Sequence, residues 1–253
     1  MSITKYTFDD TIHVVNLGDI HRGDHRCDYD SFYKTVDYIR EHDNVYWLST
    51  GDMLNVALQN SKSDVYSSQN VQNELKSLEM ELEDISDKCL GLVSSNHHKR
   101  FERAVGMDLD DLVSKRLGIP YLGKVGLINI TCGRCSYFVG LHHGVGGGRT
   151  EGAKANGAKR LDEVLPGCDC YMLGHTHAFR HFVLTHNYID RKRNNLVGIL
   201  SHYVVTGHYL QWEGSYAQDA MLPPRPIGSS ETTFYAGSTG NLTRKRIEAR
   251  FLG

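Results

Sequence analysis

Side chains that can bind metal ions recur along this chain in short motifs separated by wide intervals. Each motif follows an apolar run and carries a carboxylate, an amide or an imidazole: Asp19-Ile20-His21, Gly51-Asp52, Asn96-His97, His142-His143-Gly144 and Gly174-His175-Thr176-His177. Together they supply enough oxygen and nitrogen ligands for two metal ions that share one carboxylate. Paired metal ions of this kind activate water and hydrolyse phosphate esters, so the pattern indicates hydrolytic chemistry.

Alternating strands and helices must position these motifs. Short β-branched and apolar runs predict buried strands at 13–17, 45–48, 90–93, 136–141 and 171–173. A hairpin joins 128–131 to 136–139 through a Cys-Gly-Arg-Cys turn. Apolar residues at helical spacing predict helices at 29–40 and 71–88, with a polar loop at 60–70 before the second. This βαβαβ order predicts a largely parallel sheet covered by helices.

The motifs lie within a few residues of the carboxyl ends of the predicted strands. Open α/β sheets bind their ligands beyond these ends. A single residue such as Asp19 after a strand is usually a turn residue or a helix cap. Five motifs with complementary donor groups, each following a different strand, favour a shared site at one edge of the sheet instead.

The composition permits this hypothesis without suggesting it. The chain has 253 residues, enough for a full core, and its 40% hydrophobic and 23% charged residues are ordinary for a globular protein. A net charge of −2 and a pI near 6.7 give no global attraction for nucleic acid or an anionic membrane. The first residues lack the apolar core of a signal peptide and no run reaches membrane-spanning length, so we expect a cytoplasmic location.

Two close pairs of cysteines, Cys132 with Cys135 and Cys168 with Cys170, leave two interpretations open. Four paired thiols could bind a structural zinc ion, although the one-residue gap of the second pair differs from common zinc spacings. Reduced thiols in a cytosolic chain are the simpler interpretation.

The order of the motifs, DxH, GD, NH, HHG and GHTH, resembles that of the calcineurin-like metallophosphoesterase superfamily. The resemblance runs from Asp19 to His177, about two-thirds of the chain, and Gly-His-x-His is its most specific part. The stretch 143–159 further resembles phosphoesterases that are often found in phage and prophage genomes, which would place the protein in a host cytoplasm. The resemblance implies one α/β domain over residues 1–253, a sandwich of two mixed β-sheets flanked by helices.

The resemblance also implies a role for each motif residue. The implied metal ligands are Asp19, His21 and His177 for one ion, Asn96, His143 and His175 for the other, and Asp52 as a bridge between the two. The family often uses Mn²⁺, and mixed nitrogen and oxygen ligands also suit Fe²⁺, Ni²⁺ or Zn²⁺. A bridging hydroxide would attack phosphorus in line with the leaving oxygen.

His97 would lie over the substrate and donate a hydrogen bond or a proton to the leaving group. The chain departs from the family here, because Gly-Asn-His is usually followed by Asp or Glu and residues 95–98 of this chain read Ser-Asn-His-His. Without an acidic neighbour His97 is a poorer acid, unless another carboxylate such as Glu102 or Asp108 replaces it. The alternative is that His97 is only a turn residue.

His142 and His143 compete for one ligand position. The family ligand is followed by glycine, which favours His143. Strand alternation sends the two imidazoles to opposite faces, so only one of them can bind the metal directly.

Two arginines are candidates for substrate contacts. Arg22 follows His21 and either pairs with a substrate phosphate or faces solvent. Arg149 follows three glycines in a loop that lacks the ending of a nucleotide P-loop. This loop either places Arg149 over a phosphodiester or is a plain surface loop.

The motifs favour metal-dependent hydrolysis of a phosphoester, a diester rather than a monoester, with nucleotides or nucleic acid among the candidate substrates. Two alternatives remain open: a nuclease acting on DNA or RNA ends, and a non-catalytic binding protein on the same fold. The apolar positions of the 71–88 helix serve either core packing or a homo-oligomer interface.

Overall fold

A computed structural model describes residues 2–59, 65, 66, 68–145, 150–237 and 245–253. Its strands form two sheets, in the orders β1-β5-β6-β7-β9-β8 and β11-β10-β2-β3-β4. The strands of the six-stranded sheet are β1 (Thr4–Phe8), β5 (Val125–Cys132), β6 (Cys135–His142), β7 (Cys170–Leu173), β8 (Arg180–Asp190) and β9 (Asn195–Val205). Those of the five-stranded sheet are β2 (Ile12–Asn16), β3 (Val45–Ser49), β4 (Cys89–Leu92), β10 (Ser229–Phe234) and β11 (Ile247–Leu252).

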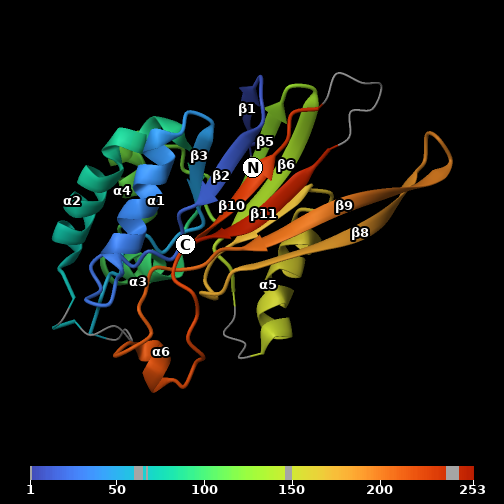
Figure 1. The fold of residues 1–253 in the computed structure, drawn as a ribbon. Helices are drawn as coiled ribbons and strands as arrows, with labels where there is room; N and C mark the ends of the chain where they lie inside the picture. The colour runs from blue at the N-terminus through green and yellow to red at the C-terminus, as the bar shows by residue number, and fades with distance from the viewer. Residues whose placement is uncertain (1, 60–64, 67, 146–149, 238–244) are drawn as a thin grey trace.

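Six α-helices and one 3₁₀ helix connect the described strands. They are α1 (Tyr29–Glu41), α2 (Val71–Leu82), the 3₁₀ helix η1 (Glu83–Lys88), α3 (Asn96–Val105), α4 (Leu109–Leu117), α5 (Glu151–Val164) and α6 (Tyr216–Asp219). Figure 1 shows α1, α2 and α4 together on one side of the sheets and α5 on the other.

The two sheets pack face to face around a shared apolar core. Alternate side chains of the central strands enter this core, among them Val14, Leu48, Leu90, Ile130, Val139 and Met172. The opposite faces pack against helices: Trp47 lies with Phe32 of α1 and Leu78 of α2, and Tyr171 lies with Leu161 of α5. A strand that is buried on both faces needs apolar side chains on both, which explains the continuous apolar runs in the sequence.

This architecture confirms the predicted sandwich of two mixed sheets flanked by helices. The largely parallel sheet predicted from the βαβαβ order is confirmed for β2, β3 and β4, which run parallel. The sheet as a whole is mixed, because β10 joins β2 antiparallel and pairs Thr232 with Val14. The strands β6 and β7 belong to the other sheet, where they too run parallel. The carboxyl ends that carry the motifs are therefore divided between two sheets.

The helix predicted at 71–88 consists of two elements, because the α-helix ends at Leu82 and a 3₁₀ helix follows. Leu75, Leu78, Leu82 and Ile85 are buried in the core between these elements and the five-stranded sheet. The indole Nε1 of Trp47 donates a hydrogen bond to the Ile85 carbonyl at 2.7 Å. These apolar positions therefore serve core packing.

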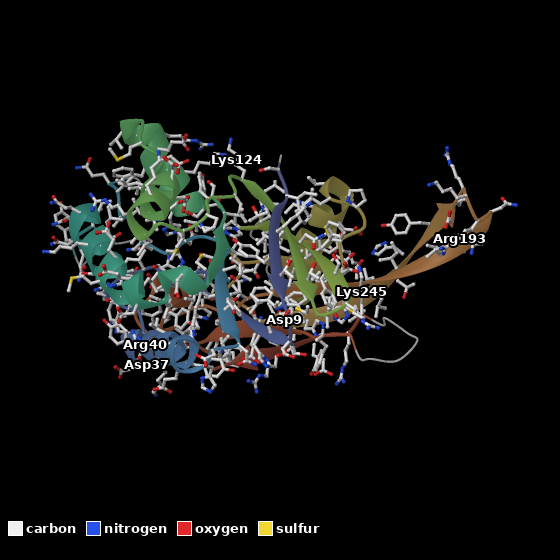
Figure 2. All side chains as sticks on the ribbon, turned by 90° about the horizontal axis from the view of Figure 1, so that it is seen from above. Asp9, Asp37, Arg40, Lys124, Arg193 and Lys245 are labelled. Atoms are coloured by element: carbon white, nitrogen blue, oxygen red, sulfur yellow. The ribbon has the colours of Figure 1, made fainter. Side chains whose placement is uncertain are left out.

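The strands β8 and β9 form a hairpin that extends well beyond the rest of its sheet (Figure 1). Each strand has 11 residues, and the turn between them carries Arg191, Lys192 and Arg193, all exposed. Figure 2 shows Arg193 at the tip, away from the body of the molecule. This basic triplet lies in a solvated turn.

All six cysteines are free and buried, and Cys132 faces Cys135 across the β5–β6 turn. Among the residues that the structure describes, no group of side chains suited to hold a metal contains a cysteine, so the structural-zinc interpretation gains no support. Within the same residues, we find no helix with the length and apolar character needed to cross a bilayer.

Candidate metal centre

Backbone hydrogen bonds hold the loops after β2 and β3 side by side. The N–H of Asp19 donates to the carbonyl of Gly51 at 2.9 Å, and the N–H of His21 donates to that of Asp52 at 3.0 Å. The parallel pairing of the two strands thus continues past their ends. As a result, the Asp-x-His and Gly-Asp motifs face one another.

The loops after β6 and β7 join this pair from the other sheet. The N–H of Gly174 donates to the His143 carbonyl at 3.0 Å, which ties the two loops together. The N–H of His175 donates to Asp19 Oδ2 at 2.8 Å, and His143 Nδ1 lies 2.8 Å from the Thr50 carbonyl. Both of these contacts cross from one sheet to the other, so they bring the motifs of both sheets into one site.

Three overlapping sets of metal-type groups result. Within each set, one ligand atom per residue lies within 4.8 Å of the others: Asp19, His21 and His177; His21, Asp52 and His97; Asp52, His143 and His175. His21 belongs to the first two sets and Asp52 to the last two. The sets therefore form one continuous cluster.

Five residues of this cluster have a left-handed backbone, with φ between 51° and 71°: Asp19, His21, Asp52, His175 and His177. A non-glycine residue in this region costs about 1–3 kcal/mol and persists only where the surroundings impose it. Strain of this kind is typical of functional sites. The surrounding structure therefore imposes this backbone conformation, which these residue types would not adopt by themselves.

At two motif positions the backbone passes so close to the ligand groups that only glycine fits. Gly51 has a φ of +97°, and a Cβ there would lie 2.6 Å from Cβ of Ser95. A Cβ on Gly174 would lie 2.5 Å from Oδ2 of Asp19. The glycines before Asp52 and His175 therefore let the loops pass close to the ligand groups.

Asp52 lies at the centre of the cluster and is 2% exposed. Its Oδ1 accepts the backbone N–H of His97 at 3.0 Å, and its Oδ2 lies 3.1 Å from Nε2 of His143. Burial favours the neutral acid, but the His143 and His97 imidazoles hold the pKa of Asp52 well below its usual range. Burial by itself would lower the pKa of His143, but the Asp52 carboxylate outweighs burial and raises this pKa to about 9. A cation bound here would displace the His143 proton, because metal ligands bind deprotonated.

Asp19, His21 and His177 make up the other end of the cluster. Asp19 is fully buried, and its Oδ1 accepts no hydrogen bond from the described residues; it lies 3.4 Å from Nε2 of His177. The Nε2 atoms of His21 and His177 are 3.1 Å apart. Burial and the neighbouring imidazoles of His97 and His177 lower the pKa of His21, which is therefore the neutral ligand form. A buried carboxylate oxygen beside two converging imidazole nitrogens fits a divalent transition metal ion.

Asn96 and His175 lie at the mouth of the site. Asn96 is the first residue of α3, and its side-chain amide nitrogen is 3.2 Å from Nδ1 of His175. Burial and His143 lower the pKa of His175. The side-chain amide of Asn96 therefore lies beside His175, a member of the set with Asp52 and His143.

His97 has neither of the acidic partners suggested by the sequence. Its Nδ1 donates to the Asn55 carbonyl at 2.6 Å, and its Nε2 lies 3.9 Å from Oδ2 of Asp52. Asp108 instead caps α4 through the N–H of Asp111, and Glu102 is exposed. Burial lowers the pKa of His97, with Arg100 acting in the same direction. A backbone carbonyl, rather than a carboxylate, orients this imidazole.

The neighbouring His98 is the histidine of this motif that pairs with a carboxylate, that of Asp110, and the sequence did not reveal this pairing. His98 is 1% exposed, and its Nδ1 lies 2.6 Å from Asp110 of α4. Burial opposes the charged imidazole, yet Asp110 raises the pKa of His98 overall. Oδ2 of Asp110 also accepts the N–H of Ser95 at 3.0 Å. Asp110 thereby fixes the start of α3, from which Asn96 and His97 project.

Two further predicted residues, Arg22 and His142, lie apart from the cluster. Arg22 is 7% exposed, and its Nε donates to both carboxylate oxygens of Glu81 at 3.0 Å, so it neither faces solvent nor reaches the cluster. Nδ1 of His142 accepts the N–H of Gly144 at 2.8 Å, and the structure brings His143 to the cluster in its place. Arg149 lies outside the described residues.

Sequence reasoning missed His208 and three cations at the site. His208, which follows the end of β9 as the other motifs follow their strands, is 6% exposed and stacks on His177 with ring centroids 4.9 Å apart. A cavity of about 410 Å³ opens over the cluster. Its wall includes Lys99, Arg100 and Arg103 of α3, beside His21, Asp52, Asn96, His97, His175 and His177. These cations could have been found from the sequence, because their i, i+1, i+4 spacing brings them together on one face of a helix.

No protein-family model and no curated protein matches this sequence. Among solved structures, one is similar over 95% of this chain and 98% of its own: a conserved uncharacterized protein, described as a predicted phosphoesterase, from Streptococcus pneumoniae, at 10% identity and a TM-score of 0.39. A second is the Thermotoga maritima protein TM1076, at 15% identity, 95% and 99% coverage and a TM-score of 0.38. Likenesses this weak carry no argument about activity, which must come from the cluster itself.

Proposed function

We propose that this protein is a metal-dependent phosphoester hydrolase that acts on phosphodiesters. The observation that supports the proposal is the continuous cluster of three overlapping ligand sets, joined through His21 and Asp52. In this proposal Asp19, His21 and His177 hold one divalent metal ion, Asn96, His143 and His175 hold the second, and Asp52 serves both. Mn²⁺ is the first candidate, and the mixed nitrogen and oxygen ligands also suit Fe²⁺, Ni²⁺ or Zn²⁺.

When bound, the two ions supply a hydroxide nucleophile at neutral pH and neutralise charge on the phosphoryl oxygens. The chain positions the groups around them. Asp52 is held by the N–H of His97, and His143 by the Thr50 carbonyl. Their other polar atoms, Oδ2 of Asp52 and Nε2 of His143, face each other in the cluster at 3.1 Å. Such backbone partners fix the orientation of metal ligands and are part of the site.

In this proposal His97 assists departure of the leaving group. Its Nδ1 is bound to the Asn55 carbonyl, which leaves Nε2 toward the cavity that it lines. From there it can donate a hydrogen bond or a proton to the leaving oxygen. Burial lowers the pKa of His97, so only a small fraction is protonated at neutral pH. We therefore expect a preference for esters whose leaving group needs little protonation.

The test compares wild-type protein with Asp52→Asn, each stripped of metal and then supplied with Mn²⁺, Ni²⁺, Zn²⁺ or Mg²⁺. We expect wild-type protein to bind two ions per chain and to hydrolyse bis-p-nitrophenyl phosphate, and the variant to lose turnover while keeping its fold by circular dichroism. Asp37→Asn is a matched control, since Asp37 lies on the surface of α1 beside Arg40 (Figure 2).

Three results would change the conclusion. Full turnover in a folded Asp52→Asn protein would overturn the dinuclear site. Two bound ions without turnover on any monoester or diester would support the alternative of a non-catalytic binding protein. Preferential cleavage at DNA or RNA ends would identify the nuclease alternative.

A further inference from the structure

One wall of the cavity is a line of positive charge that the metal cluster does not require. Lys99, Arg100 and Arg103 all line the cavity and all lie on α3. Residues three and four apart share a helix face, so Arg103 is next to both others, and like charges at these spacings destabilise a helix. An arrangement that costs helix stability points to an anionic ligand.

These cations carry no compensating partner within the described part of the chain. Several basic side chains elsewhere in the described chain are paired, as Arg22 is with Glu81 and Arg116 with Glu79. No ion pair of the described residues includes a cation of this α3 line, although acidic residues are as numerous as basic ones in the sequence, 30 against 28. Their charge is directed at the cavity.

Arg100 gives the clearest sign that a partner is missing. Its Nη2 atom is buried and makes no hydrogen bond with any described residue. A buried guanidinium nitrogen without an acceptor is costly, and phosphate oxygens are its natural partners. Burial lowers the pKa of Arg100, whereas the charge of Asp52 raises it. An anion in the cavity would satisfy this group.

The length of the line sets the kind of anion. α3 begins at Asn96, and at a rise of ~1.5 Å per residue Arg103 lies ~10 Å farther along the helix axis. A phosphodiester group carries one negative charge, which balances only one of the three cations that line the cavity. The ligand must carry negative charge along the helix, beyond the group that is cleaved.

The side chains that line the cavity also determine which part of a substrate is recognised. The side chains described around the cavity include histidines and cations but no Phe, Tyr or Trp. Proteins that bind single-stranded nucleic acid through its bases stack them on such rings. Recognition here therefore rests on phosphate groups rather than on bases.

We propose that Lys99, Arg100 and Arg103 form a subsite for further phosphates of the substrate, so that the substrate class is a polyphosphorylated chain. The inference rests on the proposed hydrolase function and names its substrate class. A nucleic-acid strand and a nucleotide or inorganic polyphosphate share this chemistry. The chain has no global positive charge, so the local line of cations must supply the attraction.

The test uses Mn²⁺-loaded wild-type protein, Arg103→Gln, and the double variant Arg100→Gln with Arg103→Gln. Arg160→Gln is the matched control, because Arg160 is exposed on α5, away from the cavity. We measure kcat/KM for a short oligothymidylate and for bis-p-nitrophenyl phosphate, inhibition by tripolyphosphate, and binding of the fluorescein-labelled oligothymidylate by anisotropy at several salt concentrations. Arg103 is exposed, so its variant should fold even if the double variant does not.

We expect Arg103→Gln to lower kcat/KM for the oligothymidylate by about tenfold more than for bis-p-nitrophenyl phosphate. The salt dependence of binding should lose a slope of about 1 per removed contact. A loss confined to tripolyphosphate inhibition would support the subsite and identify polyphosphate as its source. Equal losses on both esters, or no loss on any phosphate chain, would overturn the subsite. The anisotropy measurement needs no turnover, so it tests the subsite even if the proposed hydrolase activity is wrong.

Discussion

Replacing Glu74 with Gln should stabilise the folded protein above pH 7 and leave its stability in acid almost unchanged. Glu74 is on α2, beneath the loops that carry the metal motifs, and is fully buried. Its Oε2 accepts the N–H of Val56 at 2.9 Å, whereas Oε1 has no hydrogen bond with any described residue. A glutamine keeps the acceptor for Val56 and removes the buried charge.

The magnitude follows from the pKa. Burial raises the pKa of Glu74 from 4.5 to about 7, despite the opposing hydrogen bond from Val56. The folded state thus holds the proton more tightly than the unfolded chain. The stability from this group is fully present below pH 4.5 and is lost as the pH rises through 7. A shift of this size corresponds to about 3 kcal/mol.

The assay is urea and thermal unfolding of both proteins from below pH 4.5 to above pH 7, with a chelator present so that metal binding does not contribute. The informative quantity is the difference between variant and wild type, since the histidines titrate in both. This difference should grow by about 3 kcal/mol, or roughly 6–12 °C in Tm, as the pH rises. A difference that stays flat with pH would show that Glu74 is not held as a neutral acid.

Three further predictions concern the metal site and its support. Gly51→Ala should lower Tm and metal content together, because its Cβ would lie 2.6 Å from Cβ of Ser95; wild-type metal content would contradict this. Asp110→Asn should cost about 3 kcal/mol in urea unfolding, since it leaves buried His98 without its carboxylate, and an unchanged midpoint would show the pair to be dispensable. Chelation should lower Tm, and Mn²⁺ at 100 times its Kd should restore about 2.7 kcal/mol; a Tm that ignores Mn²⁺ would argue against binding.

Much of the local structure was predictable because strands and helices depend on short-range patterns. The strand predicted at 13–17 is β2, one residue earlier, and the helix predicted at 29–40 is α1, one residue longer. The division into two sheets was not predictable from the βαβαβ order, since pairing between distant strands such as β10 and β2 leaves no local pattern.

The sequence by itself determined which residue types follow which strands, and so which side chains were candidates for a metal site. Only the tertiary structure decided their partners: Asn55 for His97, Asp110 for His98 and Glu81 for Arg22. These contacts join residues from 12 to 59 positions apart or arise where two loops meet. Side-chain partners depend on how loops from different strands approach each other, and that approach is set by backbone hydrogen bonds and core packing across the whole chain.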